Sequence, residues 1–98
     1  MEKQQVITAL GALAHETRLD IYRLLVRAGT DGVAAGAIAE SIGLVPATLS
    51  FHLKELKNAG VISSRREGRS LIYAPEFDAM QGLLSFLTEN CCQGNGGC

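Results

Sequence analysis

Three cysteines, Cys91, Cys92 and Cys98, lie within eight residues of one another at one end of the 98-residue chain. An odd number of crowded thiols is a poor disulfide framework, and a structural zinc site would use four ligands. Thiolates prefer soft ions. Trivalent arsenic or antimony takes three sulfurs in a pyramid, so three thiolates could bind either ion without a fourth ligand. Because adjacent residues diverge by ~100° on a helix, the neighbouring sulfurs converge only if the preceding helix ends at or before Cys91.

Other uses of these thiols stay open. The stretch QGNGG permits the tight turn that would bring Cys98 over the other two cysteines, but it is also typical of a tail whose thiols have no role. Oxidation to a disulfide would give a redox switch, and two thiols would suit methylated trivalent arsenic or another soft ion. A thiol enzyme needs an electropositive pocket, whereas Glu89 is the charged residue beside the cysteines. We therefore expect neither an enzyme nor a catalytic cofactor.

A second group of residues is suited to a polyanion. Residues 46–73 carry five basic and two acidic side chains, a net charge of +3, although the whole chain carries −1. Three of the basic residues, Arg65, Arg66 and Arg69, flank an expected turn between two short strands, VISSRR and LIYA. Their guanidinium groups could reach phosphates or a narrow minor groove, and the alternative is a solvated turn.

Residues 46–58 predict a helix with one apolar side. Leu49, Leu53 and Leu56 repeat at intervals of four and three, and Pro46 suits the first turn. Small and polar groups near the N-terminus would let this helix enter a major groove, where an aromatic ring can touch a thymine methyl. Phe51 lies about 200° from Leu49 around the helix and should stay exposed. His52 could donate to a phosphate or pack at the helix edge. The candidate DNA contacts are Pro46, Ala47, Thr48, Ser50, Phe51, His52 and Lys54, together with the three hairpin arginines.

The other predicted elements are all helical. Apolar spacing predicts helices over residues 4–14, from about 15–17 to 28, over 33–42 and over 76–90, with His15 at a helix start and Gly43 as a helix terminator. The last helix has a wider apolar face than one small core can hide, which favours self-association. The expected fold is mainly α with a β-hairpin wing, a winged helix-turn-helix.

The chain resembles the ArsR/SmtB family of metalloregulatory repressors. The resemblance covers residues 5–88 and rests on HETRLDIYRLL at 15–25, ATLSFHLKEL at 47–56, AGVI at 59–62 and RREGR at 65–69. It implies a homodimer whose first and last helices form the interface. It also implies a repressor that leaves its operator when an inducer binds.

Two of the family's inducer sites are missing from this sequence. The arsenic-sensing version carries a cysteine pair on the first helix of the helix-turn-helix, but GAIAESIGL has no cysteine. The zinc-sensing version uses Asp and His residues on the last helix, but residues 76–90 contain no histidine. The resemblance therefore points to the arsenite-sensing branch whose cysteines lie beyond the last helix, with Cys91, Cys92 and Cys98 as metal ligands.

We therefore expect a homodimeric repressor that binds double-stranded DNA with an inverted repeat and responds to arsenite, with antimonite as a second inducer. Residues 1–90 would form the DNA-binding and dimerisation domain, and residues 91–98 the inducer-binding tail. An alternative is a winged helix that binds a protein instead of DNA. Binding to a protein partner that does not depend on salt concentration would favour this alternative. No stretch approaches the ~20 apolar residues that span a bilayer, and MEKQQVITAL lacks signal-peptide character, so we expect a cytoplasmic protein without membrane contact.

Overall fold

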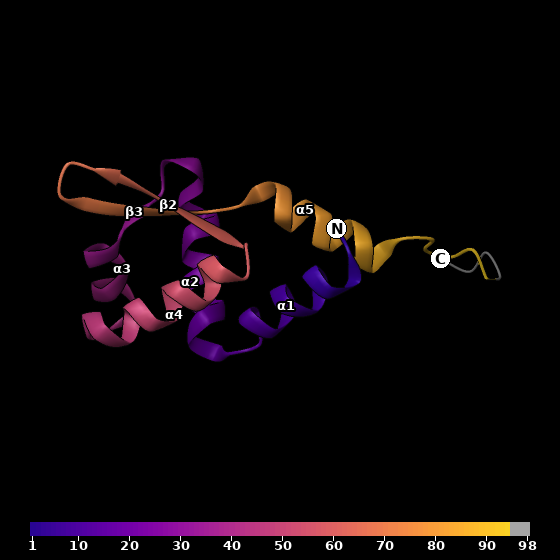
Figure 1. Ribbon diagram of the computed structural model, residues 1–98, viewed down its shortest axis with the longest axis horizontal. Coiled ribbons are helices and arrows are strands. Elements are labelled where there is room, and N and C mark those ends of the chain that lie inside the picture. The colour runs from indigo at the N-terminus through magenta and orange to yellow at the C-terminus, as the bar shows by residue number, and fades with distance from the viewer. Residues whose placement is uncertain (95–98) are drawn as a thin grey trace.

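Five α-helices and a three-stranded antiparallel sheet make up residues 1–94, the part of the chain that the structure, a computed structural model, describes (Figure 1). The elements in chain order are α1 (Lys3–Leu13), α2 (Glu16–Ala28), the 3-10 turn η1 (Gly29–Asp31), β1 (Val33–Ala34), α3 (Ala35–Ile42), α4 (Pro46–Asn58), β2 (Ile62–Glu67), β3 (Ser70–Pro75) and α5 (Phe77–Thr88). The predicted winged helix-turn-helix is confirmed.

The sheet has the order β1-β3-β2, and its longer part is the predicted hairpin. The register runs from Ile62 opposite Pro75 to Glu67 opposite Ser70, which leaves Gly68 and Arg69 as a two-residue turn. Gly68 has a φ of 62°, as such tight hairpin turns require. The wing therefore projects Arg69 at its tip and Arg66 beside it.

Residues 33 and 34 were expected to be helical, and that prediction is wrong. Val33 and Ala34 form β1, which pairs with Tyr73 and Ile72 of β3. Gly32 has φ 77° and ψ −178°, a conformation that does not continue into a helix. The two-residue strand instead satisfies backbone groups along the open edge of β3, so α3 begins only at Ala35.

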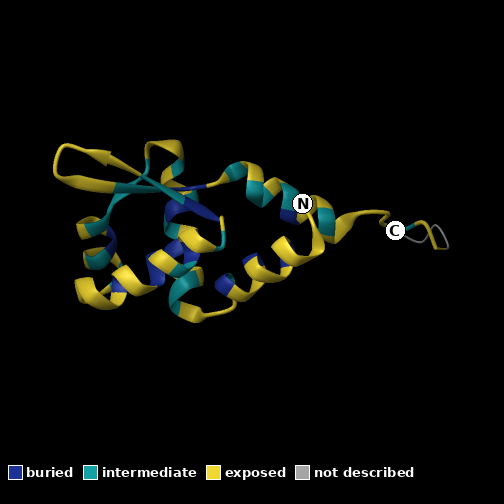
Figure 2. Cartoon of the chain, viewed as in Figure 1, coloured by how far each residue is buried: buried dark blue, intermediate teal, exposed yellow. Residues whose placement is uncertain are grey.

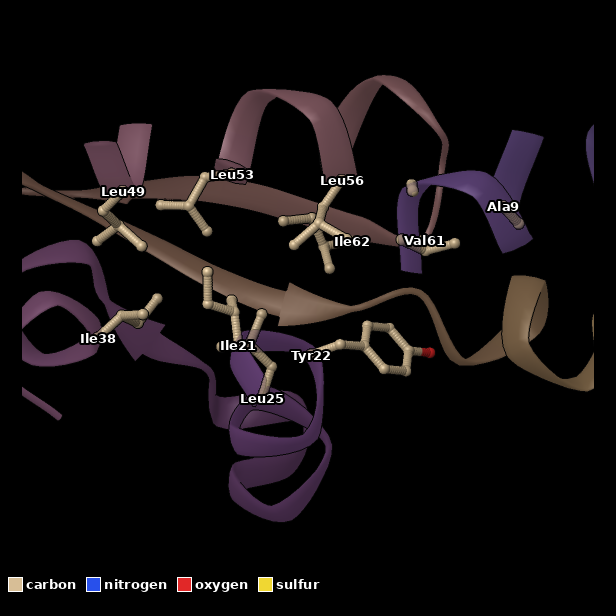
Figure 3. Packing of buried hydrophobic residues seen from close by; sticks show 11 residues of the cluster. Ala9, Ile21, Tyr22, Leu25, Ile38, Leu49, Leu53, Leu56, Val61 and Ile62 are labelled. Atoms are coloured by element: carbon tan, nitrogen blue, oxygen red, sulfur yellow. The ribbon is translucent and has the colours of Figure 1, made fainter. Parts of the chain in front are cut away.

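The helix-turn-helix consists of α3 and α4. Gly43 caps α3 in the left-handed conformation with a φ of 79°, and Pro46 occupies the first turn of α4. Leu49, Leu53 and Leu56 are buried as predicted. They pack with Ile21 and Leu25 of α2, Ile38 of α3 and Ile62 of β2 in a core enclosed by these helices and the sheet (Figure 3).

α5 and the N-terminal end of α1 converge at one end of the molecule, which is long and narrow at 54 × 23 × 22 Å (Figure 1). Large apolar side chains stay exposed on this pair of helices, and Figure 2 shows much of both surfaces open to solvent. The exposed apolar residues here are Met1, Ile7, Leu10, Leu84 and Leu87. This is the excess apolar face that the sequence predicted. No helix within residues 1–94 combines the length and apolar character needed to cross a membrane.

Candidate nucleic-acid interface

The exposed side of α4 carries small, polar, aromatic and basic groups. Burial of the leucines on the opposite side fixes this orientation. Phe51 is 54% exposed, a large fraction for a phenylalanine on a helix whose opposite side is buried in the core. The predicted contacts that lie exposed on α4 are Pro46, Ala47, Thr48, Ser50, Phe51 and Lys54. Hydroxyls, a ring and an ammonium group along one exposed helix face can contact base edges, thymine methyls and phosphates.

His52 does not belong to this exposed face. Its side chain is 8% exposed, and Nδ1 accepts a hydrogen bond from Nε of Arg18 on α2 at 3.1 Å. Burial lowers the pKa of His52 below its ordinary value, and the charges of His15 and Arg18 lower it further. Of the two roles considered for His52, the structure shows packing at the helix edge, and the expected phosphate contact is corrected.

His15 has the role expected of it at the start of α2. Its Nδ1 accepts a hydrogen bond from the backbone N–H of Thr17 at 3.2 Å, which caps the helix. The His15 ring also lies 4.9 Å from the His52 ring, centroid to centroid. The helix cap and α4 therefore meet at this histidine pair.

The wing presents two of its three arginines to solvent without a hydrogen-bonding partner among residues 1–94: Arg66 and Arg69 are both exposed. They line a shallow groove of about 430 Å³ between the hairpin and the start of α3, together with Ala34, Ala35, Gly36, Ser70 and Leu71. A nucleic-acid backbone that lay along the wing would meet both guanidinium groups.

Arg65 is exposed too, but its guanidinium group is hydrogen-bonded to other residues of the protein. Its Nε donates to Oε2 of Glu67 at 2.6 Å, and its Nη2 donates to the backbone oxygen of Asp31 at 2.6 Å. A longer bond of 3.4 Å joins Nη1 to the oxygen of Thr30. Arg65 therefore ties β2 to the turn that follows α2, and three of its five N–H donors are used within the protein. A phosphate contact by Arg65 stays a prediction, which its remaining N–H donors would have to make.

This difference between the arginines predicts different salt dependences for duplex binding. Replacing Arg66 and Arg69 together with alanine should lower the slope of log K against log salt by about 0.9 for each phosphate that the wing no longer neutralises, hence by about 2 per wing. Arg65→Ala should leave that slope nearly unchanged but cost about 1–2 kcal/mol of unfolding free energy, because it removes hydrogen bonds to backbone carbonyls. Fluorescence titration at several salt concentrations and thermal unfolding measure the two effects. A slope change of about 0.9 for Arg65→Ala, half that of the double variant, would make Arg65 a phosphate ligand.

Two of the three cysteines follow α5 directly. α5 ends at Thr88, so the requirement that the helix stop before Cys91 is met. The backbone then turns through Asn90 and Cys92, whose φ values are 61° and 67°, and places the two Sγ atoms 3.1 Å apart. Cys98 lies outside the described residues. Within residues 1–94, no three His, Cys, Asp or Glu side chains gather closely enough to hold a metal ion.

Comparison with known proteins agrees with this geometry. A family model described as a helix-turn-helix domain matches residues 13–65, more than half of the chain. The solution structure of Mb0332 from Mycobacterium bovis, described as a homodimeric winged helix-turn-helix DNA-binding domain and a possible ArsR-family transcriptional regulator, superposes with a TM-score of 0.73 at 30% identity, covering 90% of this chain and 86% of that one. The chain belongs to the ArsR-type winged helix-turn-helix transcriptional regulators.

Two curated proteins are also similar over most of the chain. The nodulation protein NolR of Rhizobium meliloti is 34% identical over 80 residues, which is 82% of this chain. This chain spans 63% of the length of NolR. YgaV of Escherichia coli, a helix-turn-helix transcriptional regulator, is 28% identical over 91% of this chain and 88% of its own length. In this ArsR-type regulator, α4 is the second helix of the helix-turn-helix and the β2–β3 hairpin is the wing.

Sequence reasoning missed two features of this ArsR-type surface. Val45, the residue before α4, is 65% exposed beside the polar face. Arg18 lies on α2, yet its guanidinium carbon is 5.6 Å from the centre of the Phe51 ring. The exposure of Val45 could have been predicted from its position just before Pro46, outside the leucine repeat of α4. Nothing in the spacing of residues 18 and 51 indicates their contact, because it depends on how α2 and α4 cross.

Proposed function

We propose that this regulator is a repressor that binds an inverted-repeat operator as a homodimer and releases it when trivalent arsenic, or antimony, binds Cys91, Cys92 and Cys98. The observation that carries the DNA-binding part is the exposed face of α4 beside the two solvent-facing wing arginines. The observation that supports the inducer is the pair of sulfurs at the end of α5.

DNA recognition follows from which groups are exposed. In a helix-turn-helix, the second helix enters the major groove with its N-terminal residues at the base edges, and dimers bind half-sites roughly 34 Å apart. The first half of α4 presents Thr48, Ser50 and Phe51 for this purpose. Arg66 and Arg69 would hold the flanking phosphates. The palindromic operator then mirrors the two-fold symmetry of the dimer.

The dimer would form through the arm of α1 and α5. Leu84 and Leu87 of α5 are 50% and 55% exposed, and Ile7 and Leu10 of α1 are 54% and 41% exposed. Several large exposed apolar side chains on two helices of a small domain favour an interaction site there. The homodimeric relative Mb0332 supports a second copy of this chain as the partner.

The inducer site is supported by the chemistry of the donor set. Zinc–thiolate bonds are about 2.3 Å long, so two thiolates separated by about the present Sγ–Sγ distance of 3.1 Å could both bind one ion of similar size. Cys92 is disulfide-bonded in the structure, so the proposed site is its reduced, thiolate form. The third proposed ligand, Cys98, would complete the pyramid. Because the backbone N–H of Cys91 donates to the carbonyl of Thr88 at 3.0 Å, an ion bound here would act on the last turn of α5.

The route from the ion to DNA would pass through the dimer. A change at the end of α5 would alter how the two subunits are set against each other, so that both copies of α4 no longer fit successive major grooves. Linkage requires the reciprocal effect: operator DNA must weaken arsenite binding by the same factor by which arsenite weakens DNA binding. A metalloid titration with and without duplex would measure this factor.

The proposal predicts that Cys91→Ser binds DNA but does not respond to arsenite. The probe is a duplex that the wild-type protein selects from a randomised library, and the measurement is a mobility-shift titration under reducing conditions with added arsenite. Arsenite should release wild type and leave Cys91→Ser bound, because two remaining sulfurs cannot complete a three-thiolate site. Selection of no duplex would overturn the DNA-binding proposal, whereas release of both proteins would overturn the cysteine site alone.

Two alternatives rest on the close pair of sulfurs. A two-thiol site for methylated trivalent arsenic or another soft ion would survive Cys98→Ser but not Cys91→Ser. A redox switch would respond to hydrogen peroxide, which takes up two electrons and two protons as two thiols become a disulfide and is reduced to water. Release by peroxide and reversal by dithiothreitol, with no effect of arsenite, would identify the switch.

A further inference from the structure

The side chain of Arg18 joins two neighbouring residues of α4. Its Nε donates to Nδ1 of His52 at 3.1 Å, and its guanidinium carbon lies 5.6 Å from the centre of the Phe51 ring. The second distance is within the range of a cation–π contact. A single half-buried side chain of α2 therefore contacts one buried and one exposed residue of the helix that faces DNA.

The three side chains form a cluster in which Phe51 keeps one side open to solvent. The Phe51 ring meets the His52 ring edge-on at a centroid distance of 5.6 Å and an interplanar angle of 64°. His52 in turn lies against His15, the N-cap of α2. Phe51 is thus supported from the protein side by His52 and Arg18, while more than half of its surface stays open.

We propose that Arg18 is a positioning residue for operator recognition. It holds the Phe51 ring in the orientation in which the ring contacts a base. It does so directly, by its contact with the ring, and indirectly, by its hydrogen bond to His52. This inference rests on the proposed DNA binding by α4. It predicts that Arg18 affects sequence preference at the base pair that Phe51 touches, although Arg18 itself touches no base.

The geometry favours this role over that of a phosphate ligand. Arg18 is half-buried, and its Nε is already used by His52. The planar guanidinium group can stack on the ring with one part and donate from another, which the point charge of a lysine cannot do. A free exposed arginine would be expected to extend into solvent, whereas this side chain lies along α4.

The arrangement also depends on the protonation of His52. Nδ1 can accept from Arg18 only while it carries no proton. The charged or titratable groups around His52 are His15 and Arg18 from α2 and its N-cap, and Glu55 on α4, which lines a groove with Arg18. The α1 residues that line the same groove are Thr8, Gly11 and Ala12, and none of them titrates. Burial lowers the pKa of His52, and the charges of His15 and Arg18 lower it further, so the neutral ring is favoured at neutral pH and acid breaks the bond to Arg18.

A double-mutant cycle on the duplex selected by wild type tests the proposal. Arg18→Ala and Phe51→Ala should each weaken binding by about 5- to 30-fold in a dimer that uses both copies, since an exposed cation–π pair contributes a modest factor per subunit. The double variant should bind no more weakly than the worse single variant. Both single variants should relax preference at the same base pair, and the salt slope should be that of wild type. The coupling should be present at neutral pH and should be lost as the pH falls far enough to protonate His52, whose pKa lies below its ordinary value.

Two further variants separate positioning from charge and from folding. Arg23→Ala removes the same charge from the exposed side of α2 and should change affinity less than about twofold, as expected of a distant surface charge. Arg18→Lys keeps the positive charge but lacks the planar guanidinium group. This variant should therefore keep the salt slope of wild type and fail to restore the sequence preference. If Arg18→Ala is unfolded by circular dichroism, Arg18→Lys takes its place in the cycle. Additive losses, a smaller salt slope or full rescue by lysine would each overturn the proposal, whereas failure of wild type to select any duplex would overturn the proposed function instead.

Discussion

Replacing both Leu84 and Leu87 with glutamate is expected to make the regulator monomeric and to abolish tight operator binding. Both side chains are about half exposed on α5, and Ile7 and Leu10 are exposed on α1. A two-fold interface would bury four copies of these leucines, and completing the burial of each contributes about 1 kcal/mol or more. Charged carboxylates at the same positions add a desolvation cost. The dimer should therefore weaken by about a thousandfold or more.

Analytical ultracentrifugation measures the dimer, and the mobility-shift assay measures its consequence for DNA. Ser85→Glu places a carboxylate on an exposed position of the same helix, away from the two leucines, and should stay dimeric. A monomer still presents one α4 and one wing, so the double variant should retain weak, salt-sensitive binding to a half-site. A double variant that sediments as a dimer would show that α5 is not the interface.

Periodicity predicted the longer elements because their apolar residues face one continuous core. Leu49, Leu53 and Leu56 define the buried side of α4 wherever the rest of the chain lies, and Gly43 and Pro46 mark the turn before it by their backbone preferences. β1 could not be predicted in the same way. Two residues are too few to show alternation, and Val33 and Ala34 become a strand only because the edge of β3 lies beside them.

The interface could be predicted only where exposure follows from helix geometry. Phe51 is exposed because it lies opposite the leucines, which the sequence alone shows. His52 lies near the edge of the buried side, and its burial depends on Arg18, 34 residues earlier. Arg65 and Arg66 are adjacent in the sequence and similar in chemistry. Only the position of the carbonyls of Thr30 and Asp31 makes one structural and leaves the other free.

Gly32→Ala is expected to destabilise the fold more than any other single change to a glycine of residues 1–94. Gly32 has a φ of 77°, and a Cβ added there would lie 2.6 Å from Cγ2 of Ile72 and 2.8 Å from the backbone oxygen of Tyr73. The unfavourable backbone conformation costs about 1–3 kcal/mol, and forcing β3 to move adds about 1–3 kcal/mol. For a domain of this size, each kcal/mol lowers the melting temperature by about 4–8 °C.

Gly29→Ala is the matched control that separates the two costs. Gly29 has a similar conformation, with φ 80° and ψ −156°, but an added Cβ there would meet nothing within 4 Å. Its destabilisation, measured by thermal and urea unfolding, should equal the conformational cost alone, so Gly32→Ala must lose more. Equal losses would show that β3 yields without cost. Because Ile72 and Tyr73 pair with β1, and Arg65 reaches the turn before Gly32, movement of β3 should also disturb the wing. Gly32→Ala should therefore weaken duplex binding even at temperatures where it stays folded, whereas Gly29→Ala should not.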